Sequence, residues 1–288
     1  MKIEQKFKEQ SVVFSFEVFP PKREQSIDTI YNTLDGLCDL NPDFISVTYG
    51  AGGKKSSLIT ADIAGIIKEK YQIEPMAHLT CVNSTKEDVR FVLHKLEEKE
   101  IHNILALRGD INPDMEPRKE FQYAKDLIQF IKEQGNYHIA AACYPEGHPE
   151  ANSFEEDLCH LKQKVEVGAK HLVSQLFFNN EDFYSFVHKS RERGITVPIE
   201  AGIMPVVNKS QIERMVTLCG ASLPPKFVKM MSRFEHNKEA LTDAGIAYAT
   251  EQIVDLIAHG VDGIHLYTMN NPYVARRISE NIKELRKG

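Results

Sequence analysis

The run Val12-Val-Phe-Ser-Phe-Glu-Val-Phe19, which ends at Pro20 and Pro21, sets the architecture expected for the whole chain. Its β-branched and aromatic residues predict a β-strand, because such side chains suit a pleated backbone. Seven runs of similar composition follow, at residues 43–50, 74–82, 103–109, 138–145, 171–178, 197–204 and 263–269. Segments with apolar residues at helical spacing lie between them, at residues 27–40, 86–99, 123–134, 154–167 and 182–193. Strands that alternate with helices predict a parallel sheet with right-handed crossovers.

A doubly wound sheet and a closed barrel both fit this alternation. Eight strand–helix units within 288 residues, with no Gly-x-Gly-x-x-Gly after the first strand, favour the barrel. We therefore expect an α/β fold, a single (β/α)8 TIM barrel over residues 1–288. The connection at 205–240 is longer than a normal loop and contains a predicted extra helix over 226–234. We interpret it as a helical insertion before the last helix and strand.

Helix ends are marked by capping residues. Ser84-Thr-Lys-Glu87 has the composition of a capping box ahead of the helix over 86–99. Gly168, Gly194 and Gly260 are expected to end helices.

Composition narrows the class of protein. The net charge is −6, and Lys and Arg are spread along the chain, which argues against a nucleic-acid partner. The charged first ten residues do not resemble a signal peptide, and no apolar run approaches the roughly 18 residues that span a bilayer. Five cysteines without a Cys-x-x-Cys pair suit a reducing compartment and argue against a structural zinc. We expect a cytoplasmic enzyme with no membrane partner.

The chemistry of a parallel barrel lies at the C-terminal ends of its strands. Polar residues collect there: Glu17, Thr48, Tyr49, His78, Thr80, Arg108, Asp110, Tyr144, His148 and Gln175. Strand alternation places Ser15 and Glu17 on one face. A carboxyl among aromatic residues and prolines is poorly solvated, which favours its protonated form and suits a proton donor. The alternative is a structural carboxylate paired with an Arg or a Lys.

Two glycine-containing turns leave alternatives open. In Arg108-Gly-Asp110, the Arg would meet a pyrophosphate and the Asp a heterocyclic ring edge, or the two would form a salt bridge that seals the barrel mouth. Gly50-Ala-Gly-Gly53 would let backbone amides approach a phosphate, or would be a flexible turn.

Other conspicuous side chains have simpler interpretations. His78 and His148 lack the spacing of metal ligands, so no metal site is expected. Phe177 and Phe178, as strand neighbours, are expected to divide between core and pocket. Cys81 and Cys143 lie in apolar strands and are expected to be packing residues.

Seven motifs occur together in a fixed order, from about residue 12 to residue 282. They are Ser15-Phe-Glu-Val-Phe-Pro-Pro21, Ser46-Val-Thr-Tyr-Gly50, His78-Leu-Thr-Cys81, Leu107-Arg-Gly-Asp110, Tyr144-Pro-Glu-Gly-His-Pro-Glu150, Gln175-Leu-Phe-Phe178 and His265-Leu-Tyr-Thr-Met-Asn270. In these motifs the chain resembles the methylenetetrahydrofolate reductase family, and its length resembles the short bacterial form.

The resemblance implies FAD at the barrel mouth and hydride transfer by ping-pong kinetics. NADH or NADPH would be the electron donor, and 5,10-methylenetetrahydrofolate would be reduced to 5-methyltetrahydrofolate. On the matching positions, Glu17 would be the general acid toward nitrogen 10 of the folate, and Asp110 would lie beside both flavin and folate. Gln175 and Gln211 would contact the folate. A homo-oligomer is also implied.

The positions that match flavin contacts of the family are Thr48, Tyr49, Ala51, His78, Arg108, Gly109, Asp110, Tyr123, Ala124, Tyr144, His148, Ala151, Asp157 and Lys164. Asp157 and Lys164 are seven residues apart, two turns along one face of a predicted helix. One position departs from the family, because Asn271 stands where many members have an Arg that would bind the folate glutamate tail. Arg276 or Arg277 would supply that charge instead.

Two alternatives remain at this stage. A flavin-binding subunit would receive electrons from a partner protein, docked on Phe227, Met230, Met231 and Phe234 unless these residues bury the insertion's own helix. A different flavin barrel, related to proline dehydrogenase, is the other.

Overall fold

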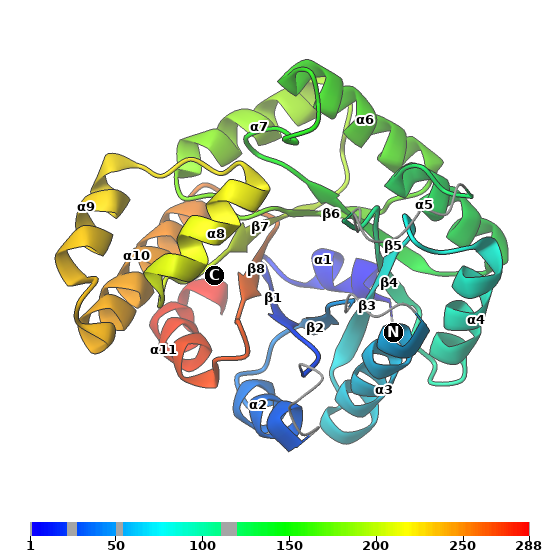
Figure 1. The fold of residues 1–288 in the computed structure, drawn as a ribbon, viewed down its shortest axis with the longest axis horizontal. Helices are drawn as coiled ribbons and strands as arrows, with labels where there is room; N and C mark the ends of the chain where they lie inside the picture. The colour runs from blue at the N-terminus through cyan, green and yellow to red at the C-terminus, as the bar shows by residue number, and fades with distance from the viewer. Residues whose placement is uncertain (1, 22–27, 50–53, 111–119, 288) are drawn as a thin grey trace.

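The structure, a computed structural model, is a closed barrel of eight parallel strands (Figure 1). It describes residues 2–21, 28–49, 54–110 and 120–287, apart from the side chains of residues 28, 54–57, 211, 212, 214, 215 and 218. The strands are β1 (Val13–Val18), β2 (Phe44–Val47), β3 (Glu74–Thr80), β4 (Asn103–Leu107), β5 (His138–Cys143), β6 (His171–Ser174), β7 (Ile199–Ile203) and β8 (Gly263–Tyr267). Pairing of β8 with β1 closes the sheet, which confirms the predicted fold class.

Helices follow the strands and surround the barrel (Figure 1). They are α2 (Asp28–Cys38), α3 (Lys54–Tyr71), α4 (Lys86–Glu97), α5 (Ala124–Gln134), α6 (Phe154–Val167), α7 (Asn180–Glu192), α10 (Lys238–Ala258) and α11 (Pro272–Ile282), and the turn η2 (Leu285–Lys287) ends the described chain. Among the described residues, no helix has both the length and the apolar composition needed to cross a membrane.

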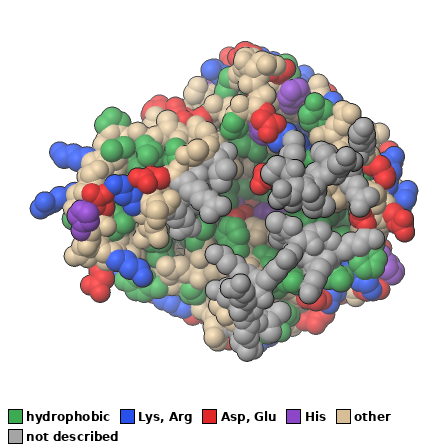
Figure 2. Space-filling model, in the orientation of Figure 1, with side chains coloured by type: hydrophobic (Ala, Val, Ile, Leu, Met, Phe, Trp, Pro, Cys, Tyr) green, Lys and Arg blue, Asp and Glu red, His purple; other side chains and the backbone are tan. Residues whose placement is uncertain are grey.

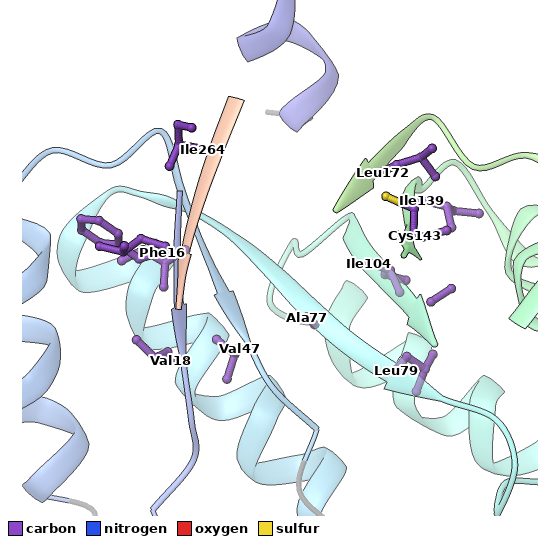
Figure 3. Packing of buried hydrophobic residues seen from close by; sticks show 14 of the residues in the cluster. Phe16, Val18, Val47, Ala77, Leu79, Ile104, Ile139, Cys143, Leu172 and Ile264 are labelled. Atoms are coloured by element: carbon purple, nitrogen blue, oxygen red, sulfur yellow. The ribbon is translucent and has the colours of Figure 1, made fainter. Parts of the chain in front are cut away.

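The main core lies between the strands and this outer ring of helices. Alternate strand residues point outward, as Phe16, Val18, Val47 and Ile264 do in Figure 3, and all four are fully buried. The odd-numbered residues of β1 therefore point into the barrel, so Glu17 reaches the interior near its C-terminal end.

The N-terminal segment closes the opposite end of the barrel, which the sequence reasoning did not anticipate. It consists of η1 (Ile3–Gln5) and α1 (Lys6–Glu9), and α1 lies within the ring of strands in Figure 1. Ile3 is fully buried, and its backbone N–H donates to Oδ1 of Asn103 at 2.9 Å. The ring of Phe7 lies 5.1 Å from that of His171.

The insertion between β7 and α10 contains two helices, α8 (Lys209–Cys219) and α9 (Pro225–Phe234), where one was predicted. Phe227 and Met231 are buried, and Met230 and Phe234 are partly buried against the same apolar cluster. The ring of Phe227 lies 4.4 Å from that of Phe178. These four side chains therefore pack the insertion's own helix against the barrel, which is the second of the two interpretations given from the sequence.

Two local predictions also need correction. The capping box of α4 is Thr85 with Asp88, because each side chain accepts the other's backbone N–H, at 3.1 and 3.0 Å. Ser84 instead donates to the Thr80 carbonyl at 3.0 Å. Phe177 and Phe178 are both buried in apolar clusters, and neither is among the described residues that line the two cavities at the C-terminal ends of the strands. Strand β6 ends before them, so strand alternation does not apply. The three predicted helix-ending glycines do have positive φ.

Candidate active site

Two connected cavities open at the C-terminal ends of the strands, where the surface is hollowed in Figure 2. The larger, about 590 Å³, is lined by eleven residues predicted from sequence: Glu17, Thr48, Tyr49, His78, Thr80, Arg108, Gly109, Asp110, Tyr144, His148 and Gln175. The smaller, about 350 Å³, adds five more: Tyr123, Ala124, Ala151, Asp157 and Lys164. The linings share Leu107, Arg108, Ala142, Tyr144 and His148, so the two cavities lie next to each other.

Two predicted residues cannot be placed in this way. Ala51 lies outside the described residues. Gln211 belongs to α8, but its side chain is outside the described part of the chain.

Glu17 is the buried acid of the larger cavity, with 7% of its surface exposed. Its Oε2 lies 3.6 Å from Nε2 of His78 and 3.6 Å from Nε2 of His265. Within the described residues no Arg or Lys comes within 4 Å of this carboxyl, so the structural pairing considered from sequence is not present. Burial lowers the pKa of His78 to about 4, more strongly than nearby Glu17 raises it, and this imidazole is neutral at pH 7.

The end of β1 is held in place by the loop that follows β8. Thr268 donates its hydroxyl to the Glu17 carbonyl at 2.6 Å. Asn270 accepts the Phe19 N–H at 2.9 Å and donates to the Phe19 carbonyl at 2.8 Å. Tyr267 also lines the cavity, and its hydroxyl donates to the Ser174 carbonyl at 2.7 Å. The backbone that carries Glu17 is therefore fixed from a strand distant in sequence.

Arg108 forms a two-pronged ion pair with Glu150, with Nη2 2.7 Å from Oε1. Asp110, the salt-bridge partner considered as one alternative from the sequence, is exposed at the cavity mouth and does not pair with Arg108. Between them Gly109 has φ of 82°, and a Cβ there would lie 2.9 Å from Cβ of Thr80. The glycine is thus required both by its backbone conformation and by the close approach of β3.

The smaller cavity holds a half-buried cation beside a buried acid. The Lys164 ammonium donates to the Ala142 carbonyl at 3.0 Å, and Asp157 accepts the His148 N–H at 3.2 Å. Burial lowers the pKa of Lys164 and raises that of Asp157, and each charge partly offsets the shift of the other. At one side the Tyr123 and His160 rings lie 6.4 Å apart and nearly parallel.

This arrangement suits a long anionic ligand with aromatic ends. An ammonium such as that of Lys164 can donate hydrogen bonds to a phosphate, and the larger cavity can take a flat ring system. An FAD molecule has this shape and charge distribution, so the residues present fit the cofactor implied by the resemblance. Among the described residues, no three His, Cys, Asp or Glu side chains are arranged to hold a metal ion.

The cations expected for a glutamate tail are engaged elsewhere. Asn271 caps α11 by accepting the Val274 N–H at 3.3 Å. Arg276 bonds to Asp39 at 2.7 Å, and Arg277 lies 3.4 Å from Asp243. Both arginines pair with carboxylates of neighbouring helices or their ends, and neither is among the residues that line the two cavities.

The sequence reasoning gave no role to His265, Tyr267 or Glu200. His265 and Tyr267 are two residues apart on β8, so they lie on one face of that strand, as Ser15 and Glu17 do on β1. This spacing could have indicated from the sequence that both side chains point toward the site. Glu200, a fully buried acid within β7, was a second signal.

Comparison with known proteins decides the family. The model of the methylenetetrahydrofolate reductase family matches residues 2–283. The chain belongs to the methylenetetrahydrofolate reductase family. It is 35% identical to the 5,10-methylenetetrahydrofolate reductase of Pectobacterium carotovorum over 268 residues, which are 93% of this chain and 89% of that protein. The corresponding Escherichia coli reductase is 34% identical, with 93% and 90% covered.

Longer plant members of the methylenetetrahydrofolate reductase family match over part of their length. "Methylenetetrahydrofolate reductase (NADH) 1" of Arabidopsis thaliana is 36% identical over 272 residues, 89% of this chain and 46% of that protein. The chain thus spans about half the length of the plant relatives it matches. A solved structure from Clostridium thermocellum, which binds two copies of 5-methyl-5,6,7,8-tetrahydrofolic acid, shares the fold. The TM-score is 0.71 at 14% identity, over 98% of this chain and 99% of that one.

Proposed function

We propose that this chain reduces 5,10-methylenetetrahydrofolate to 5-methyltetrahydrofolate, with FAD held in the two cavities and a nicotinamide as electron donor. The observation that carries the proposal is Glu17, a buried carboxyl in the larger cavity, with two imidazoles beside it and, among the described residues, no Arg or Lys within 4 Å. The bacterial relatives, which match over nine-tenths of this chain, are named for this reaction.

The cofactor site would use both cavities. When bound, FAD supplies the hydride transfer between the nicotinamide and the folate. Lys164 and Asp157 would hold its phosphates and ribose in the smaller cavity. Thr48, Tyr49 and His78 would line the place of the ring system, and Asp110 at the mouth would lie between flavin and folate.

Glu17 would act as the general acid. Protonation of folate nitrogen 10 breaks its bond to the methylene carbon and leaves an iminium on nitrogen 5 that can accept hydride. His78 lies beside this carboxyl, with its Nε2 3.6 Å from Oε2 of Glu17, and its imidazole is neutral at pH 7.

Gln175 would bind the folate through its amide NH₂ group. Its Oε1 accepts the Leu176 N–H at 2.9 Å, which fixes the orientation of the amide within the larger cavity. Gln211 is proposed as a second folate contact from its position in the family motif alone.

Three broader features are also proposals. NADH is favoured as the donor because the plant relatives carry it in their names. The cytoplasm is favoured because all five cysteines are free thiols. A homo-oligomer is proposed from the family resemblance.

Anaerobic mixing of the FAD-loaded chain tests the function. NADH should bleach the flavin absorbance, and added 5,10-methylenetetrahydrofolate should restore it and yield 5-methyltetrahydrofolate. A flavin that recovers with folate only after chemical reduction, and never bleaches with NADH or NADPH, would show that a partner protein supplies the electrons. A chain that never binds FAD would refute the proposal.

A further inference from the structure

The smaller cavity is lined by two lysines and one arginine, Lys125, Lys164 and Arg108. The charge of Arg108 is balanced by its two-pronged ion pair with Glu150. Among the described residues, no carboxylate oxygen lies within 4 Å of the ammonium of Lys125 or of Lys164. The cavity therefore contains two lysine charges that are not paired with an acid.

Lys125 lies in the first turn of α5 and is half-buried in the wall of the smaller cavity. Its ammonium donates to Oε1 of Gln163 on α6 at 2.8 Å. Helices α5 and α6 lie side by side in the outer ring (Figure 1). An amide oxygen carries no net charge, so this contact orients the ammonium and leaves its positive charge intact. Gln163 is its one hydrogen-bond partner in the described part of the chain, and two ammonium hydrogens remain for a ligand.

Lys164 is the next residue of α6 after Gln163, and its ammonium is held in a similar way. It donates to an uncharged acceptor, the Ala142 carbonyl, at 3.0 Å. The two lysines thus contact neutral oxygen atoms, and adjacent positions of α6 bring them to the same cavity wall. Two ammonium groups that keep both charge and free hydrogens suit a diphosphate, which carries two negative charges.

The acids on this wall do not compete for Lys125, because they accept hydrogen bonds from the backbone. Glu156 accepts the Asn152 N–H at 2.7 Å. Asp126, the neighbour of Lys125 in α5, accepts the Tyr123 N–H at 2.9 Å. The charge of Lys125 is therefore directed to whatever occupies the cavity.

The positions of the two lysines predict which phosphate each would meet. Ala142, which binds Lys164, lines both cavities, so Lys164 lies where the two cavities adjoin. Lys125 and Gln163 line the smaller cavity alone. In FAD one phosphate is attached to the flavin side and the other to adenosine. With the ring system in the larger cavity, Lys164 would meet the flavin-side phosphate and Lys125 the adenosine-side phosphate.

We propose that Lys125 is a further cofactor-binding residue, which binds the adenosine-side phosphate of FAD and is positioned by Gln163. The inference rests on the proposed binding of FAD in the two cavities. It also assigns a selectivity, because the charge of Lys125 favours the dinucleotide FAD over FMN, which lacks the second phosphate.

Binding of FAD and of FMN to the apo chain, measured by calorimetry or flavin fluorescence, tests the assignment. Lys125→Gln should weaken the binding of FAD by about tenfold, the lower end for a hydrogen bond to a charged group, because the side chain is half-buried. The same variant should leave the affinity for FMN unchanged. Lys164→Gln should instead weaken the binding of both flavins. Lys125→Arg keeps the charge and should lose less affinity for FAD than Lys125→Gln.

Two further variants make the comparison independent of one substitution. In Gln163→Glu a carboxylate would pair with Lys125 and repel the phosphate, so the affinity for FAD should fall more than that for FMN. Lys132→Gln is the matched control, because Lys132 is exposed on the same helix and is not among the residues that line the two cavities. It should bind both flavins as the wild type does. The melting temperature of the apo chain, which should be the same in every variant, is the control for folding.

Equal affinity for FAD in the wild type and Lys125→Gln would overturn the proposal. Equal losses of FAD and FMN affinity in that variant would also overturn it, because a general change in the cavity would then explain the result. Failure of the wild-type chain to bind FAD would instead refute the proposed function.

Discussion

Lys164→Gln tests whether the smaller cavity holds the phosphates of FAD. Lys164 is a desolvated ammonium on α6, with one of its hydrogens donated to the Ala142 carbonyl at 3.0 Å and the others free to reach an anion. A hydrogen bond to a charged group contributes about 1.5–3 kcal/mol, which corresponds to roughly a 10- to 150-fold change in Kd. Because the Lys164 side chain is only half-buried, we expect a loss of affinity within that range.

Titration of FAD into the apo chain, followed by calorimetry or flavin fluorescence, measures this loss. Lys162→Gln is the matched control, because Lys162 lies on the same helix, is 48% exposed and faces Glu166 at 3.8 Å. It should change the affinity less than twofold, as exposed ion pairs contribute little. Equal affinity in wild type and Lys164→Gln, or equal losses in the two variants, would show that the phosphates lie elsewhere.

Two stability predictions concern the barrel itself. Phe227→Ala should lower the free energy of unfolding by about 3–5 kcal/mol in urea titrations, because the ring is fully buried against Phe178. The neighbouring Val228 is 44% exposed, so Val228→Ala should lower it by less than about 0.5 kcal/mol. Similar losses for both variants would contradict this packing. Burial lowers the pKa of His78 to about 4, below its unfolded value, so the unfolded chain binds this proton first and stability falls as pH drops from 6.5 toward 4. Relative to wild type, His78→Asn should lose about 1.4 kcal/mol less per pH unit across that window, and parallel curves of melting temperature against pH would disprove it.

The local sequence pattern was sufficient to predict the barrel, because each strand and each helix shows the hydrophobic periodicity of its own secondary structure. Glu17 could be placed inside the barrel from alternation along β1, and the polar strand ends could be placed together because parallel strands end on one side. The closed eight-strand sheet confirmed this part.

Contacts between distant segments were not predictable in this way. The partner of Arg108 proved to be Glu150, 42 residues away, and not the neighbour two residues along. Ile3 and Phe7 close the N-terminal end of the barrel, and this packing site exists only once all the strands are assembled. The hydrophobic periodicity of single segments therefore could not predict it. The two histidines beside Glu17 come from β3 and β8, and only closure of the sheet brings them together.

Half-reactions of Glu17→Gln give the most direct measurement of the central claim. The glutamine keeps the shape and the hydrogen-bonding capacity of the side chain but cannot donate a proton to folate nitrogen 10. We predict that NADH bleaches the flavin at the wild-type rate, whereas reoxidation by 5,10-methylenetetrahydrofolate slows by about 10²- to 10⁴-fold, the usual contribution of a general acid. Equal slowing of both half-reactions, or wild-type reoxidation by the folate, would contradict the account.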